Sequence, residues 1–567
     1  MKKTLISLCI FALVSSFICA ADVKGEIGNL KWLLRNGELA ITGPTVSKSE
    51  VTSVEIPATI EGKTVTKIFT GAFKACSNLT EVKLPNSIKV IEKDAFSGCK
   101  NLTEIKLPNN LETIGQQAFY NCGLTEITIP SSVKTIEKEA FRSESLMEIK
   151  ILDAPVSIED GAFRSCFNLI SVELGNKVVR IGDNAFENYK LDSFTMPDSV
   201  KSIGKAAFKN AINLSSINLS KNLQTIGDSA FSGCKSLKSI VIPDSVTTIG
   251  KKTFSECEKL ENVKLSGNLK AIPTGVFINC KSLKEITIPD SVVNIESKYA
   301  ESPFYKCENL ETVVIGKSVK TLNNNLFTDC NKLKSVNIPE SVKTIGNEVF
   351  ANTAIEKISI PDSVISIGEN AFYDCESLRE VKYSNNIKKI PKRAFFGCIL
   401  LESYPDNCEE YGEEAFYGCV SLKEITIKPN IVYGKYCFGA SWEPKFDETI
   451  NKIVIADGIE SFENETFVWY SIYNKNLTVN ELEFSSSVKN TTNGQLFIGA
   501  KMINNLIIDS PDFEATTVKD SMRIEHLKCY KSVYEKVFGE GWSTIHVVEF
   551  FDSEDTIVTE YVEKDYK

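Results

Sequence analysis

The sequence predicts a β-rich solenoid, in which short coils of the chain stack on one another. Three observations predict it: a phenylalanine that recurs in most cases every 22 or 23 residues, alternating apolar residues ahead of it, and a Pro that usually ends the alternating run. A fixed period of this length is typical of solenoids rather than of several globular domains. The clear copies are Phe73, Phe96, Phe119, Phe141, Phe163, Phe186, Phe208, Phe231, Phe254, Phe277, Phe304, Phe327, Phe350, Phe372, Phe395 and Phe416, and the weaker copies are Phe438, Phe467 and Phe497.

Each repeat predicts two short strands. In the repeat Ser236–Cys257, Ile240 and Ile242 lie two residues apart, which is the period of a strand with one buried face. Pro243 follows and has no N–H for a ladder, so the first strand ends there. Val246–Ile249 is rich in β-branched residues and predicts a second short strand.

The end of each repeat predicts a short helical turn rather than a helix. Phe254 and Cys257 lie three residues apart, so one turn places both side chains on the inner side. Gly250, just before the turn, permits a positive φ. One coil cannot bury these groups alone. Stacking therefore lets each Leu, Ile and Phe pack on its counterpart in the next coil.

Composition excludes several classes of function. Charged residues make up 24% and hydrophobic residues 43% of the 567 residues, which argues against a disordered chain or a protein with many membrane spans. The net charge of −10 offers no basic surface for nucleic acid. The two histidines, His526 and His546, lie near the C-terminus, so a histidine-based catalytic or metal site is not expected in residues 1–525. We predict no catalytic, cofactor-binding or metal-binding residues and no enzyme activity.

The first 21 residues predict a secretory signal peptide. Lys2 and Lys3 precede an apolar stretch, Thr4 to Cys19, that is short for a membrane span, and small residues follow at Ala20 and Ala21. A membrane anchor is the alternative. No other apolar run of about 18 residues occurs, so we expect no membrane span after signal cleavage. The protein is therefore expected to be secreted or held at the cell surface.

The cysteines form a column in the predicted solenoid. Twelve of them lie three residues after a repeat Phe, and other repeats place Glu144, Tyr189, Ala211 or Thr353 at that position. Such tolerance suits a packing position better than a disulfide framework, and a free Cys behaves as a small buried hydrophobe. We predict buried free thiols. Zinc is not expected, because the spacing is one thiol per repeat.

The repeated signature L-x-x-I-x-I-P-x-S-V-x-x-I-G-x-x-A-F-x-x-C, as at Leu333 to Phe350, resembles the BspA-like leucine-rich repeat family of surface proteins. The resemblance covers roughly Ile27 to Ile545. It implies a leucine-rich repeat solenoid of the α/β class, with stacked parallel strands on one face, short second strands, and short helical turns instead of long helices. Because Pro follows the strand where horseshoe repeats carry Asn, we expect no Asn ladder.

The same resemblance and spacing divide the chain into six parts. They are a signal peptide (1–21), an N-terminal cap (22–66), regular repeats of 22 or 23 residues (67–430), irregular longer repeats (431–510), a C-terminal cap (511–548) and an acidic tail (549–567).

The first-strand face is the main candidate for binding. The residues on either side of the first Ile of each L-x-x-I-x-I strand point away from the core, so we expect two polar rows on a continuous sheet. A soluble surface without a ligand is the alternative. A long polar face suits a macromolecule better than a small molecule. The candidate residues are Glu81, Lys83, Glu104, Lys106, Glu126, Thr128, Glu148, Lys150, Lys264, Glu285 and Thr287.

A second candidate is aromatic. Trp and Tyr side chains are typical interface anchors, although irregular coils also use them to fill a core. The candidate patch comprises Tyr433, Tyr436, Trp442, Trp469 and Tyr470.

The family resemblance implies a noncatalytic, adhesin-type scaffold that binds an extracellular protein or glycan. One alternative is a structural component of the cell envelope or surface layer. Another is a noncatalytic polysaccharide-binding protein. We expect no cofactor and no nucleic-acid partner, and the sequence leaves the ligand and the oligomeric state open.

Overall fold

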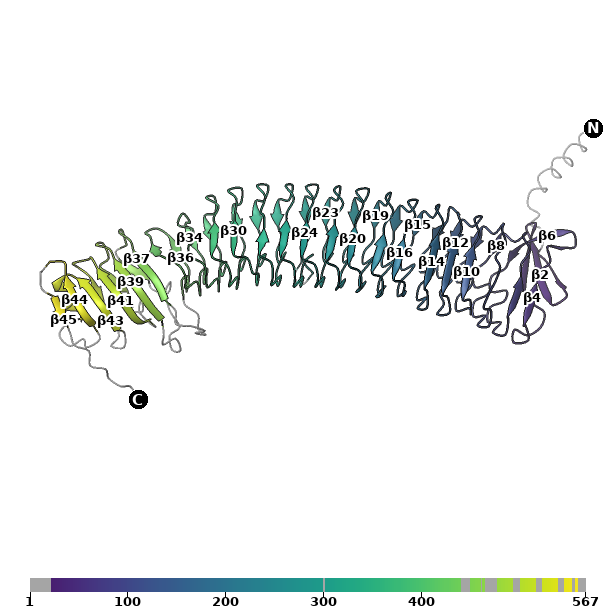
Figure 1. Ribbon diagram of the computed structural model, residues 1–567, viewed down its shortest axis with the longest axis horizontal. Helices are drawn as coiled ribbons and strands as arrows, with labels where there is room; N and C mark the ends of the chain where they lie inside the picture. The colour runs from purple at the N-terminus through teal and green to yellow at the C-terminus, as the bar shows by residue number, and fades with distance from the viewer. Residues whose placement is uncertain are drawn as a thin grey trace, which may run out of the picture. The chain divides into compact units, whose positions relative to one another are not determined.

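The computed structural model describes residues 22–298, 301–439, 449–459, 461–463, 477–492, 500–515, 523–538, 545–552 and 556–558. The chain forms two compact units, Met1–Leu269 and Lys270–Lys567, and each is a stack of short coils (Figure 1). The predicted signal peptide and most of the predicted acidic tail lie outside the described residues. Within those residues, no helix is both long and apolar enough to cross a membrane. The division into six parts stays a prediction.

The second strands of the first unit form one continuous parallel ladder. Each ends in a buried Ile, and in most of them a Thr or Ser precedes it: Thr135 of β11 lies between Thr113 of β9 and Ser157 of β13. Stacked β-branched side chains stabilise such a ladder. Its strands are β6 (Lys63–Ile68), β8 (Val90–Ile91), β9 (Thr113–Ile114), β11 (Thr135–Ile136), β13 (Ser157–Ile158), β15 (Arg180–Ile181), β17 (Ser202–Ile203), β19 (Thr225–Ile226) and β21 (Thr248–Ile249).

An N-terminal hairpin motif extends this ladder. The strands β1 (Val23–Ile27) and β2 (Leu30–Arg35) are antiparallel, β2 pairs with β3 (Glu38–Pro44), and β3 runs parallel to β6. A short strand, β5 (Thr59–Ile60), pairs with β6 from outside the path.

The first strands of this unit form only small groups, so the prediction of a continuous sheet on this face is wrong. They pair as β4–β7, β10–β12–β14, β16–β18 and β20–β22. Residues 102–107 form no strand at all. The coils are already held together by backbone hydrogen bonds elsewhere, so this side tolerates breaks in strand pairing. The strands are β4 (Ser53–Glu55), β7 (Glu81–Lys83), β10 (Glu126–Ile129), β12 (Glu148–Ile151), β14 (Ser171–Leu174), β16 (Ser193–Thr195), β18 (Ser216–Asn218), β20 (Ser239–Val241) and β22 (Asn262–Lys264).

The turns at the repeat Phe are short, as predicted, but left-handed residues divide them. Asp94 and Gly98 have φ angles of 58° and 77°. Alternate amides consequently point along the stack: Phe96 N donates to Ala118 O of the next coil at 2.8 Å, whereas Ser97 N donates to Asp94 O within its own coil at 3.1 Å. The turns therefore add a third backbone ladder.

The core is a column of phenylalanine rings beside a column of thiols. The rings of Phe208, Phe231 and Phe254 are fully buried and nearly parallel, with centroids 5.3 and 5.5 Å apart. The thiol of Cys234 donates to Phe208 O of the preceding coil at 3.3 Å, and Cys257 repeats the contact with Phe231 O. All fifteen cysteines of the described residues are buried and free, which confirms the predicted thiols.

Side-chain hydrogen bonds join the turns of neighbouring coils, at a position other than that of the Asn in horseshoe repeats. Asp198 Oδ1 accepts from Lys221 N at 3.0 Å, and Asp244 Oδ1 accepts from Gly267 N at 2.7 Å. A carboxylate or amide at this position satisfies a backbone N–H that no strand pairs. The ladder is built from the turn that follows Pro and not from the position after the strand.

The second unit repeats the design and ends in longer strands. Its first strands are β24 (Glu285–Thr287), β26 (Thr312–Val314), β28 (Ser335–Val336), β30 (Lys357–Ser359), β32 (Glu380–Lys382), β35 (Ile425–Ile427), β37 (Thr449–Ile455), β39 (Leu477–Phe484), β41 (Ala500–Ile508), β43 (Arg523–Cys529) and β44 (Ile545–Phe550). The last strand, β45 (Thr556–Val558), runs antiparallel to β44. Its second strands are β23 (Ala271–Ile272), β25 (Asn294–Ile295), β27 (Thr321–Leu322), β29 (Thr344–Ile345), β31 (Ser366–Ile367), β33 (Lys389–Ile390), β34 (Glu410–Tyr411), β36 (Val432–Tyr433), β38 (Ser461–Glu463), β40 (Asn490–Thr492) and β42 (Glu514–Ala515). The helical elements are α1 (Lys531–Val533) and the π-helix η2 (Tyr534–Phe538).

A tyrosine replaces a first strand in this unit. Residues 401–407 contain no strand, in line with the weak strand pattern there. The hydroxyl of Tyr404 accepts from Thr426 N at 2.8 Å and donates to Thr426 O at 3.0 Å. One side chain thereby supplies the hydrogen bonds that a paired strand would have made to Thr426.

Candidate functional site

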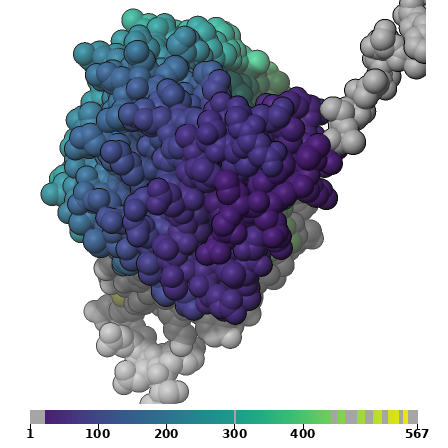
Figure 2. Space-filling view, turned by 90° about the vertical axis from the view of Figure 1, so that its right-hand side faces the viewer, coloured from purple at the N-terminus to yellow at the C-terminus, as the bar shows by residue number. Residues whose placement is uncertain are grey.

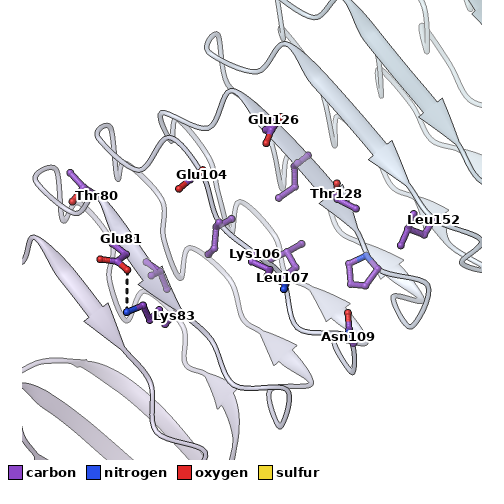
Figure 3. A pocket seen from close by; sticks show the side chains of 14 residues that line it. Thr80, Glu81, Lys83, Glu104, Lys106, Leu107, Asn109, Glu126, Thr128 and Leu152 are labelled. Carbon is purple, nitrogen blue, oxygen red and sulfur yellow. Dashed lines mark ion pairs between the residues drawn. The ribbon is translucent and has the colours of Figure 1, made fainter.

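Six of the predicted first-strand residues border one shallow depression in the first unit, which we call the strand-face depression. Its volume is about 520 Å³, and β7, the strandless segment 104–107 and β10 form its floor (Figure 3). The six predicted residues are Glu81, Lys83, Glu104, Lys106, Glu126 and Thr128.

The charged residues form two rows. Figure 3 shows Glu81, Glu104 and Glu126 in one line across three coils, with Lys83 and Lys106 in a parallel line. All five side chains are exposed. Strand alternation produces the rows, since residues two apart share a face while the apolar residue between them points into the core.

Most of this charge is not neutralised within the first unit. Lys83 Nζ lies 3.3 Å from Glu81 Oε1, and both side chains are about 60% exposed, so this pair contributes little to stability. The structure gives Glu104, Lys106 and Glu126 no ion pair with any residue that it describes. Their charges remain available to a partner.

The missing strand shapes the floor. Ile105 is half-buried, whereas its counterpart Ile127 on β10 is only 3% exposed. The coil at residues 104–107 therefore offers apolar surface between the charged rows.

Sequence reasoning missed part of the lining. Leu152 reaches the depression and is 38% exposed, and Asn109 contributes an exposed amide. A signal existed for Leu152, because it stands where the preceding repeat carries Pro130. Departures from the repeat pattern are therefore as informative as the pattern itself.

The other predicted first-strand residues lie elsewhere. Glu148 and Lys150 are on β12, in register with Glu126 and Thr128, and Lys150 Nζ lies 2.7 Å from Glu173 Oε2. Lys264 lies on β22, farther along the first unit. Two more predicted residues, Glu285 and Thr287, belong to β24 of the second unit.

The described part of the aromatic candidate patch contributes mainly to packing. Tyr433 is half-buried and stacks on Tyr411 with centroids 5.3 Å apart, and its hydroxyl accepts from Lys428 N at 3.1 Å. Burial raises the pKa of Tyr433 to about 12. Tyr436 is half-buried beneath the ammonium of Lys435, 4.9 Å from the ring centroid. The remaining members, Trp442, Trp469 and Tyr470, lie outside the described residues.

The chemistry that the strand-face depression offers is ion pairing, hydrogen bonding and apolar contact. In the part of the chain that the structure describes, no three His, Cys, Asp or Glu side chains gather as a metal site. The depression is open and spans several coils, so it suits an extended surface of a macromolecule.

Comparison with known proteins agrees with this architecture. A family model described as BspA type leucine rich repeat region (6 copies) matches residues 66–191, 179–302, 297–405, 343–471 and 403–522. None of the curated proteins matches the chain.

Solved structures match the chain at low identity and with TM-scores below 0.5. A leucine-rich repeat protein from Bacteroides ovatus is 24% identical, with 73% of this chain and 95% of that chain covered and a TM-score of 0.46. A leucine rich cell surface protein from Faecalibacterium prausnitzii is 22% identical, with 72% and 89% covered and a TM-score of 0.28. The pneumococcal vaccine antigen PcpA is 16% identical, with 95% and 99% covered and a TM-score of 0.26.

Proposed function

Because the chain belongs to the BspA-type leucine-rich repeat family, we propose that it is a noncatalytic, adhesin-type scaffold that binds an extracellular protein. The proposal places it outside the cell, either secreted or at the cell surface, after removal of residues 1–21. The observation that carries the proposal is the strand-face depression with its two rows of exposed, mostly unpaired charges.

The position of the depression supports a binding role. The coils beneath it are fixed by the second-strand ladder and by the stacked Phe rings, such as Phe96 on Phe119 at 5.4 Å. Binding groups on a rigid support lose little conformational freedom when a partner docks. Side chains on this face can therefore vary without disturbing the fold.

The charge pattern supports a protein partner over a neutral glycan. A row of Glu beside a row of Lys is complementary to a surface that presents basic and acidic side chains in two matching rows. A neutral sugar polymer would instead require exposed aromatic platforms, and the lining contains no Trp, Tyr or Phe.

A charge-swap variant tests the proposal. Exchanging the two charges of one coil, Glu104→Lys with Lys106→Glu, leaves the net charge unchanged. Purified protein from Asp22 to Lys567 is cross-linked in host-cell or matrix extract and in the producer's envelope extract, and captured proteins are identified by mass spectrometry. We expect saturable capture of a foreign protein, which the swap abolishes.

A matched control separates the depression from the rest of the face. The double change Ser216→Lys with Asn218→Glu places the same two charges on β18, another first strand of the same unit. This control should capture the foreign protein as the unaltered chain does. Capture of only the chain itself or its own envelope would instead support the structural alternative, and capture of polysaccharide alone would support the glycan-binding alternative.

A further inference from the structure

The two strand ladders of the first unit begin differently at their N-terminal ends. The second-strand ladder continues beyond β6 into β3, β2 and β1, so three strands cover its start. The first-strand ladder begins with β4, which pairs with β7 and with no other strand among the described residues. The N-terminal motif thus caps one ladder and leaves the outer edge of β4 open.

The open edge of β4 presents main-chain groups in the geometry of a strand. Thr52 O accepts a hydrogen bond from the neighbouring coil at 2.8 Å, and Ile56 N donates one to that coil at 3.0 Å. In a parallel strand, the peptide groups of alternate residues point to opposite sides. The N–H and C=O groups of Ser53 and Glu55 therefore point away from β7. Such an edge is a template for a further strand.

A second depression lies beside this edge. Its volume is about 570 Å³, and Ser53, Val54 and Glu55 form part of its lining. The lining also includes Ile27 and Val46, each 40% exposed. Figure 2 views the molecule from this N-terminal end, coloured purple. The edge therefore faces a space bordered by apolar side chains rather than a flat solvated surface.

The charge of this second depression is negative. Glu50 and Glu55 contribute carboxylates, and no Lys, Arg or His is among the residues that line it. Lys48 lies on the same loop, but its ammonium donates to Lys74 O at 2.7 Å. A segment that binds here is therefore favoured by basic side chains together with apolar ones.

We propose that the outer edge of β4 accepts an extended segment of a partner protein, with alternating basic and apolar residues, as an added β-strand. Main-chain hydrogen bonds to Ser53 and Glu55 would hold the segment, its apolar side chains would contact Ile27 and Val46, and its basic side chains would meet Glu50 and Glu55. This surface is distinct from the strand-face depression, so either proposal can fail alone.

Three peptide probes test the mode of binding. A fluorescent octapeptide of alternating Lys and Val is titrated against the chain from Asp22 to Lys567, and fluorescence polarisation reports binding. A second octapeptide carries N-methyl groups on alternate residues, which remove the N–H donors of one edge, and a third carries Glu in place of Lys. We expect the first peptide to bind, the N-methylated peptide to bind at least about tenfold more weakly, and the Glu peptide not to bind. Equal binding of the first two peptides would overturn the proposal.

Two variants of one residue test the site. Ser53→Pro removes the N–H that points away from β7 and leaves the β4–β7 bonds in place, whereas Ser53→Ala keeps that N–H. We expect Ser53→Pro to weaken binding of the Lys–Val peptide by about tenfold and Ser53→Ala to leave it within about twofold. Unchanged peptide binding by Ser53→Pro would refute the site. The site would also be refuted if the chain forms dimers and Ser53→Pro abolishes the dimer but not peptide binding. If Ser53→Pro does not fold, the N-methylated peptide decides the matter on the unaltered chain.

Discussion

The turn side and the first-strand side of each coil contrast in how uniform they are. On the turn side, almost every coil places a Phe ring on the ring of its neighbour and a small buried side chain, usually a thiol, three residues later. On the first-strand side, the exposed positions change from Lys83 to Thr128, Glu173 and Val241 along the first unit. The hydrogen-bonded strand ladder is also interrupted there.

This contrast shows how the molecule separates stability from recognition. The uniform side buries its groups in contact with identical groups, so a change there damages two interfaces at once. The variable side bears exposed charges on coils that are already fixed, so changes there leave the stack intact. We therefore expect substitutions on the two sides to have very different effects.

The largest effect is expected in the phenylalanine column. Phe231→Ala removes a fully buried ring stacked between Phe208 and Phe254. The free energy of unfolding of the first unit should fall by about 4 kcal/mol, as measured by urea denaturation with hydrogen exchange. Ser239→Ala on the next coil, an exposed position of β20, is the matched control and should change it by less than about 0.5 kcal/mol. Similar losses in both variants would remove the contrast.

The next largest effect is a loss of stability at alkaline pH, which follows from the buried thiols. Burial raises the pKa of Cys166 and of Cys234 from 9.0 to about 12. Because the folded state favours the neutral thiol, its contribution is complete below pH 9 and is lost as the pH rises from 9 towards 12. At pH 10 each such thiol should cost about 1.4 kcal/mol of stability. Urea midpoints at pH 7.5 and pH 10 measure this. In Cys234→Ala the decrease should be smaller, and stability that does not fall would contradict buried thiols.

A smaller effect of opposite sign is expected at Tyr189, which occupies a position of the thiol column. Its hydroxyl is buried without a hydrogen-bond partner among the described residues. Tyr189→Phe should therefore raise the free energy of unfolding by about 1 kcal/mol. Tyr404→Phe provides the contrast, because the Tyr404 hydroxyl bonds to both Thr426 N and Thr426 O, so its loss should destabilise. Thermal melts of the two variants should shift in opposite directions, and a destabilised Tyr189→Phe chain would refute the interpretation.

The smallest effect on stability is expected on the first-strand face. Lys106→Glu alters an exposed side chain with no ion pair among the described residues. The free energy of unfolding should change by less than about 0.5 kcal/mol in the same urea experiment. A loss of more than about 2 kcal/mol would show that this face supports the fold as well.

The sequence was sufficient to predict the repeating core. The Phe period predicted the ring column, and the variety of residues at the Cys position predicted buried thiols instead of disulfides. Both follow from periodicity, because identical groups one coil apart must meet in a stack. The outward direction of Glu104 and Lys106 follows from strand alternation in the same way.

The features that the sequence did not predict depend on backbone conformation and single contacts that residue type does not indicate. Left-handed φ angles occur at Lys252 and Arg393, which are not residues that favour them, because the turn ladder requires alternate amides to point along the stack. Residues 104–107 form no strand, yet their sequence resembles that of the neighbouring repeats. The half-burial of Ile105 could therefore not be predicted. Tyr404 replaces a strand through its hydroxyl, a role that no periodic pattern predicts.

Site-specific photo-crosslinking tests most directly the claim that recognition occurs on the first-strand side. A photoreactive amino acid replaces Thr128 in the strand-face depression or Thr248 on the second-strand ladder, both exposed residues of the first unit. Each protein is illuminated in host-cell or matrix extract, and crosslinked partners are identified by mass spectrometry. We expect a foreign protein to be crosslinked from Thr128 and not from Thr248. Equal crosslinking from both positions, or crosslinks from Thr128 to further copies of the chain alone, would contradict it.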